Sequence, residues 1–256
     1  MHTTKLSSSI DPSERAIRIT GTLYMLTAGI FFAANVLLLR AFATDGSAWL
    51  SSGIRFLVGG GICLFLSRRE GKQLIRRVLT QRNLIVRGLV GGVGVVCFYS
   101  AIPGLGAGKA TFIQTSYVVL GPICAVFMLG ETFNFQSIML AFLAFVGMFL
   151  MSGAGISGWE ISPSFMLAIA AAILSAWAVV MIRQLSRTET SSTIFAAQCV
   201  HGLLICIVPA TMAFAEMSFI RVMVLIVCGF LAAGGQLLLT IGFRYLSVAQ
   251  GCLLNV

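Results

Sequence analysis

Residues 88–115 read GLVGGVGVVCFYSAIPGLGAGKATFIQT, and this stretch indicates how the whole chain is organised. Displaced by 141 positions, it lies over residues 229–256, which read GFLAAGGQLLLTIGFRYLSVAQGCLLNV. Glycines meet glycines near the start, Leu105 meets Leu246, and the pattern of apolar and small residues carries across. We interpret the two stretches as copies of one structural unit, because self-similarity at a fixed spacing is the mark of an internal repeat.

A second pair of segments supports the same repeat. Residues 32–40, FAANVLLLR, lie over residues 175–183, SAWAVVMIR, at a displacement of 143 positions. One copy then contains five apolar segments, so the second copy enters a membrane in the opposite direction. Inverted repeats of this kind are typical of secondary transporters.

The composition predicts an all-α polytopic membrane protein. Of the 256 residues, 58% are apolar and only 10% are charged, with a mean hydropathy of +0.99. Soluble domains carry about 25% charged residues, and a spanning helix needs about 20 consecutive apolar residues. The predicted spans are 20–39, 48–67, 86–103, 108–129, 134–154, 163–183, 193–214 and 222–243.

The repeat predicts a ten-helix fold built from two inverted five-helix units, truncated after the start of helix 9. The first unit covers residues 20–154, and the second, incomplete unit covers residues 163–256. A ninth apolar segment begins after Arg244, but the sequence stops at Val256 before it can cross the membrane. We therefore expect an open side where the last two helices would pack, and weak transport by this chain.

The basic residues predict the orientation in the membrane. Seven of the 17 Lys and Arg residues lie between Arg68 and Arg87, which indicates a cytoplasmic loop. With the N-terminus inside, 13 of the 17 face the cytoplasm, and residues 1–18 form a cytoplasmic tail. We expect a multi-pass protein of the cell (inner or plasma) membrane, in contact with lipid. The net charge of +9 is assigned to this topology and not to nucleic-acid binding.

The segment Gly104–Thr111, GLGAGKAT, resembles a phosphate-binding loop without meeting its requirements. That motif needs a first glycine where this chain has Pro103, and a hydroxyl residue where it has Ala110. The loop must also follow a strand of a soluble α/β unit. We interpret the segment as a tight turn between two spans.

From the sequence we expect a protein that is not an enzyme and that has neither a cofactor nor a metal site. Its seven cysteines all lie in apolar runs without a C-x-x-C pair, and His2 and His201 are the sole histidines. No arrangement of nucleophile, base and acid stands out along the chain.

The most specific stretch for a family resemblance is ATFIQTSYVVLGPICAVFMLGETF, residues 110–133, with Pro122 in mid-helix and the turn Leu129–Glu131. Together with Arg55 and the FYSAIPGLGAGKAT entry into this stretch, it resembles the EamA-type transporters of the drug/metabolite transporter superfamily. The resemblance implies a carrier that moves a small metabolite or drug-like solute by alternating access. Its cavity would be lined by helices 1, 3, 4, 6, 8 and 9, with helix 7 at the periphery. The alternative is a non-transporting or inactive membrane fragment or interaction protein, and a homodimer stays open.

Polar and aromatic residues on the cavity helices of that family are the candidate substrate-binding residues, with packing between helices as the alternative. They are Asn35, Tyr99, Gln114, Trp177, Gln236, Thr240 and Asn255. Gln114 is the best placed, because it lies two turns before Pro122 and its repeat equivalent is Asn255.

Two cations within the spans have a possible charge role. Arg55 lies seven residues into its helix, where it either pairs with neighbouring helices or contacts substrate. Lys109 opens the 108–129 span, where it either reaches the interface or attracts substrate. Gly88 with Gly92, and Gly234 with Gly235, are interpreted as close helix-packing surfaces.

Overall fold

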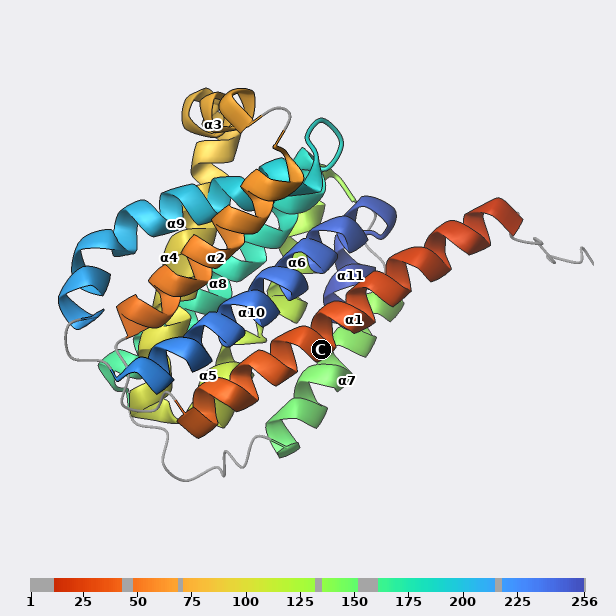
Figure 1. Cartoon of the computed structure of the whole chain (residues 1–256). Helices are drawn as coiled ribbons and strands as arrows, with labels where there is room; N and C mark the ends of the chain where they lie inside the picture. The colour runs from red at the N-terminus through yellow and green to blue at the C-terminus, as the bar shows by residue number, and fades with distance from the viewer. Residues whose placement is uncertain are drawn as a thin grey trace, which may run out of the picture.

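The computed structural model describes residues 12–42, 48–68, 71–131, 135–151, 161–214 and 218–255, and every regular element among them is a helix (Figure 1). The helices are α1 (Pro12–Phe42), α2 (Ala48–Leu66), α3 (Gly71–Thr80), α4 (Arg82–Leu105), α5 (Ala107–Gln114), α6 (Tyr117–Leu129), α7 (Phe135–Met151), α8 (Pro163–Leu185), α9 (Ser191–Phe214), α10 (Phe219–Tyr245) and α11 (Val248–Leu254).

Seven segments of the described chain are long and apolar enough to cross a membrane. They are α1, α2, α4, α5 together with α6, α8, α9 and α10. The remaining predicted span, 134–154, corresponds to α7, which has 17 residues. Residues 152–160 lie outside the described residues. The prediction of an all-helical, multi-pass membrane protein is therefore confirmed.

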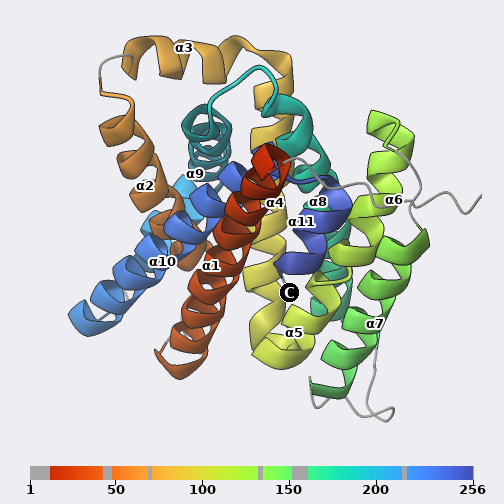
Figure 2. The same cartoon turned by 90° about the vertical axis from the view of Figure 1, so that its right-hand side faces the viewer.

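The spans pack in pairs around a common centre (Figures 1 and 2). α1 lies along α10, α4 lies along α8, and α2 packs against α9. α4 also contacts α9, as α10 contacts α2, and α11 lies against α6. The most deeply buried side chains, among them Phe56, Phe195 and Phe243, lie at these interfaces.

Glycines allow α4 to approach α9 closely. A Cβ atom on Gly88 would lie 2.5 Å from the backbone oxygen of Ala197, and one on Gly92 would lie 2.9 Å from the Cα of Gly202. Close approach through small residues is how helices associate where lipid removes the hydrophobic driving force. The predicted packing surface at Gly88 and Gly92 is confirmed, and Gly234 and Gly235 likewise contact α1.

We expect Gly88→Ala to destabilise the folded chain. The new methyl group meets a backbone oxygen, which cannot rotate away, so the helices must separate. Overpacking of this kind costs about 1–3 kcal/mol, and the melting temperature of the detergent-purified protein should fall by at least about 2 °C. Gly61→Ala on α2 is the matched control, because no atom lies within 4 Å of its added Cβ. An unchanged melting temperature in Gly88→Ala would contradict this packing.

The predicted 108–129 span is broken in its middle. α5 ends at Gln114, residues Thr115 and Ser116 form a turn, and α6 starts at Tyr117. Around this turn some backbone bonds connect residues three apart, such as Ser116 N–H to Ile113 O at 3.1 Å. Pro122 lies beyond the turn, and its ring crowds the carbonyl of Val118 in the first turn of α6. The predicted span 108–129 is one membrane-crossing segment, Ala107–Leu129, and it consists of two helices joined by this turn.

The basic segment is helical over residues 71–80, where the sequence predicted a loop. Leu74 and Val78 are buried one turn apart on one face of α3, while Lys72, Arg76 and Arg77 are exposed on the other. The chain then enters α4, so the last residue of the basic run lies inside the helical bundle. Residues 12–18 of the predicted N-terminal tail belong to α1, which begins at Pro12.

Candidate functional site

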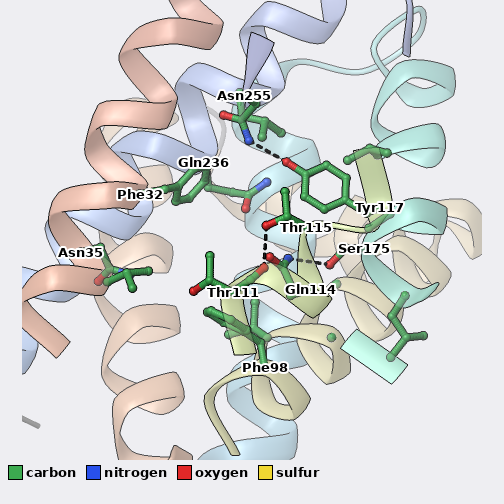
Figure 3. A pocket seen from close by; sticks show the side chains of 18 of the residues that line it. Phe32, Asn35, Phe98, Thr111, Gln114, Thr115, Tyr117, Ser175, Gln236 and Asn255 are labelled. Atoms are coloured by element: carbon green, nitrogen blue, oxygen red, sulfur yellow. Dashed lines mark hydrogen bonds between the residues drawn. The ribbon is translucent and has the colours of Figure 1, made fainter. Parts of the chain in front are cut away.

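A cavity of about 610 Å³ lies in the middle of the helical bundle (Figure 3). Its walls come mainly from α1, α4, α5, α6, α8 and α10, with Asn255 contributed by the end of α11. α2 and α9 each contribute one side chain, Arg55 and Gln198. Most of the lining is apolar, and a few polar groups converge on the same space, which is the usual character of a small-molecule site.

The broken span supplies one polar wall of the cavity. Thr111, Gln114, Thr115 and Tyr117 all face it from α5, the turn and α6. The side-chain amide of Gln114 donates to Ser175 Oγ at 3.1 Å, which connects the broken span to α8. Helices interrupted in mid-membrane are where secondary transporters place their substrates.

Asn255 closes the wall beside the start of α6 (Figure 3). Its amide donates to Tyr117 Oη at 2.9 Å, which connects α11 to α6. α11 is fixed at its start by a capping box, in which the Ser247 side chain accepts from Gln250 N–H and Gln250 accepts from Ser247 N–H. This local signal orients the short helix so that Asn255 reaches the cavity.

Arg55 is buried in the cavity wall, with 7% of its surface exposed. Its Nη1 donates to Tyr99 Oη at 3.2 Å, and its Nη2 donates to Gln236 Oε1 at 3.4 Å. Asn35 Nδ2 donates to the same Tyr99 oxygen at 3.2 Å. The guanidinium carbon also lies 5.8 Å from the centre of the Tyr99 ring, within cation–π range. All of these partners are neutral, so none of them cancels the charge.

Arg87 is the largest side chain that is almost fully buried, with 1% exposed. Its Nη2 donates to Gln198 Oε1 at 3.0 Å, and Gln198 Nε2 donates to the Gly91 carbonyl at 3.1 Å. The guanidinium lies over Gly91, where any Cβ atom would overlap Nη1. Arg87, Gly91 and Gln198 all line the cavity.

Comparison with known proteins identifies the family. The EamA-like transporter family matches residues 19–153. The chain belongs to this family. One solved crystal structure aligns with 95% of this chain and 83% of its own chain, with a TM-score of 0.68 and 16% sequence identity. That likeness extends the shared fold to nearly the whole chain, and no curated protein matches it. The protein is a multi-pass membrane protein of a transporter family.

Of the residues proposed from the sequence of this EamA-like protein, five line the cavity: Asn35, Arg55, Gln114, Gln236 and Asn255. Two others support that lining from behind. Tyr99 bonds Asn35 and Arg55, and Thr240 is fully buried and donates to the Gln236 carbonyl at 2.7 Å.

Trp177 and Lys109 lie elsewhere and are not among the lining residues. Trp177 is 40% exposed on the outside of α8. The cavity face of that helix is formed by Ser175, Ala178 and Ile182, which follow the i, i+3, i+7 spacing of one helical stripe. Position 177 falls outside this stripe, so its placement in the cavity was wrong.

Three cavity residues had not been expected from the sequence. Arg87 is the last residue of the run assigned to the basic cytoplasmic loop, although it follows the apolar residues 84–86 of α4 and lies within the predicted span 86–103. Gln198 had been disregarded because the family resemblance implied a peripheral helix 7. Ser175 is a small hydroxyl residue without any distinguishing sequence context.

A charged network lies at the end of the bundle that carries α3. Gly130, with φ 65°, ends α6 and presents Glu131 to Arg183 at 3.9 Å. Arg183 Nη1 also donates to the carbonyls of Phe243 and Arg244 at 2.9 and 3.0 Å. The network therefore connects the ends of α6, α8 and α10.

The segment Gly104–Thr111 does not form a phosphate-binding loop. Gly104 belongs to the last turn of α4, and Gly106 reverses the chain at φ 77°. Residues 107–111 then form the first part of α5. Within the described residues no group of three His, Cys, Asp or Glu side chains could hold a metal ion.

Proposed function

We propose that this chain is a secondary transporter, which carries a small solute through the central cavity by alternating access. The observation that carries the proposal is the cavity itself, of about 610 Å³, enclosed by helices from both ends of the sequence and lined by converging polar groups. Such a volume fits a metabolite-sized molecule. Membership of a transporter family favours transport as the function. The residues at the cavity wall provide a site where the solute can bind.

An inverted repeat of the chain is supported by how the helices pair. With α1 equivalent to α8 and α4 to α10, the α1–α10 contact corresponds to the α4–α8 contact. By the same rule the α2–α10 contact corresponds to the α4–α9 contact, and α1–α11 corresponds to α5–α8. A pseudo-two-fold axis relating the two halves would produce this pairing, and it is the geometry that alternating access uses.

The α2–α9 contact, which lies on that axis, adds a detailed correspondence. Residues 59–63, GGGIC, align with residues 202–206, GLLIC, at the displacement of 143 positions seen elsewhere in the chain. A Cβ atom on Gly59 would lie 2.7 Å from the ring of Phe195, and one on Gly202 would lie 2.6 Å from the ring of Phe56. Each glycine thus receives an aromatic ring from the opposite helix.

Access to the cavity differs between the two ends of the bundle. The lining residues Arg40 and Gly108 are exposed at the end of α1 and the start of α5. At the opposite end, the network around Arg183 joins α6, α8 and α10. We propose that this end faces the cytoplasm, since the basic helix α3 lies there (Figure 2). An impermeant thiol reagent should modify Arg76→Cys from the cytoplasmic face alone, and modification from outside would reverse the orientation.

Solute exchange tests the proposed transport directly. The full chain is reconstituted into liposomes, and uptake of labelled organic acids, amines and neutral solutes is measured with and without the same unlabelled solute inside. A carrier with one site alternating between two sides gives saturable uptake that the internal solute accelerates. Uptake of every solute class equal to that of protein-free liposomes, or rising linearly with concentration, would reject the carrier proposal.

A further inference from the structure

The cavity wall carries positive charge without any matching negative charge. Arg55 and Arg87 line it from inside the bundle, and Arg40 lines it at the exposed end of α1. None of the cavity-lining residues in the described chain is acidic. The acidic side chains with described surroundings, Glu131 and Glu189, instead lie within 4.0 Å of Arg183 and Arg77 in the charged network at the other end.

Both buried guanidinium groups also retain hydrogen-bond donors that the protein does not use. Arg55 Nε has no partner, and neither do Arg87 Nε and Nη1. Each of these atoms is buried, and the bonds that the two side chains do make go to neutral oxygens of Tyr99, Gln236 and Gln198. Burying an ionised group without a counter-charge is strongly unfavourable, and an unmade bond at such a group adds to that penalty.

We infer that the cavity binds an organic anion, whose carboxylate or phosphate group is held by Arg55 and Arg87. This inference rests on the proposed function and gives the chemical class of its substrate. A guanidinium group matches the planar, two-oxygen face of these anions, and the unused donors supply the bonds. Phe32, Phe98 and Phe112 line the same cavity, so the rest of the ligand is apolar.

Each of the two arginines bridges the two copies of the proposed repeat. Arg55 on α2 bonds Gln236 on α10, and Arg87 on α4 bonds Gln198 on α9. Arg55 and Gln198 are 143 positions apart, which is a displacement seen between the two copies. Both arginines belong to the first copy and both glutamines to the second, so an anion held by the arginines lies at the interface of the two halves.

The test compares two ligands that differ in charge alone. The full chain is placed in phosphatidylcholine nanodiscs, and binding of 3-phenylpropanoate and of its neutral amide, 3-phenylpropanamide, is measured by equilibrium dialysis at neutral pH. Empty nanodiscs provide the background. We expect the carboxylate to bind at least about tenfold more tightly than the amide, the factor typical of one charge-assisted hydrogen bond.

Variants assign that preference to the two arginines. Arg55→Gln and Arg87→Gln should each bring the two ligands to within about threefold of one another, while the affinity for the amide stays the same and so reports an intact cavity. Arg55→Lys and Arg87→Lys should recover part of the preference, because the charge remains. Arg76→Gln on the exposed face of α3 is the matched control and should behave as the unmodified chain.

The outcomes separate the anion site from transport and from lipid. Absent carboxylate binding, equal binding of acid and amide, or a preference that survives both Gln variants would overturn the inference. Carboxylate binding without solute exchange in liposomes would support the anion site and reject the carrier proposal. Exchange restricted to amines or neutral solutes would support the carrier proposal and reject the anion site. Repeating the assay with phosphatidylglycerol in the nanodiscs identifies the source of the anion: competition indicates a lipid phosphate, and undisturbed binding indicates a dissolved solute.

Discussion

Ala178→Trp is expected to abolish solute exchange without unfolding the protein. Ala178 is 7% exposed and belongs to the stripe of α8 that faces the cavity, between Ser175 and Ile182. An indole at this position fills space in the cavity that the solute needs, and it lies next to the polar wall formed by Gln114. Exchange should fall to the level of protein-free liposomes, while the yield and elution volume in size-exclusion chromatography remain those of the unmodified chain.

Ile173→Trp is the matched control for that variant. It introduces the same side chain into the same helix, at a position where 55% of the residue is exposed on the outer surface of the bundle. Lipid can accommodate the larger ring there, so exchange should continue at nearly the normal rate. Normal exchange in Ala178→Trp, or equal losses in both variants, would show that the solute does not pass through this cavity.

The arrangement of the spans could be predicted from the sequence because lipid imposes a simple rule. Apolar segments of about 20 residues must be helices, and this placed α2, α8, α9 and α10 to within a few residues of their ends. Gln114 and Asn255, which the repeat places at equivalent positions, both line the cavity. Both results depend on patterns that extend over many residues, which chance seldom produces.

The details of the cavity depend on interactions that such patterns do not encode. The span that contains Pro122 is divided into α5 and α6 by a turn at Thr115 and Ser116. Arg87 belongs to the basic run by its charge, yet it lies near the start of the predicted span 86–103 and is buried in α4. Trp177 is turned away from the cavity by its angular position on α8. Each of these placements is set by helix phase or a helix boundary, and a shift of one or two residues reverses it.

Our account requires the cavity to open alternately to the two sides of the membrane. Ala178→Cys places a small reactive group at the cavity wall, and an impermeant maleimide can be applied to right-side-out and to inside-out membrane vesicles. Modification is read at that peptide by mass spectrometry, so the buried and half-buried native cysteines do not interfere. Leu57→Cys, at a residue 62% exposed on the outer surface of α2, is the lipid-facing control and should stay unmodified in both preparations.

The account predicts modification of Ala178→Cys in both kinds of vesicle, because a carrier exposes the same site to each side in turn. The rates can differ, since one end of the bundle is joined by the Arg183 network and the other exposes Arg40. In a valid experiment Leu57→Cys stays unmodified and Arg76→Cys is modified from its own side alone. Under those conditions, modification of Ala178→Cys from a single side, or from neither, would contradict alternating access through this cavity.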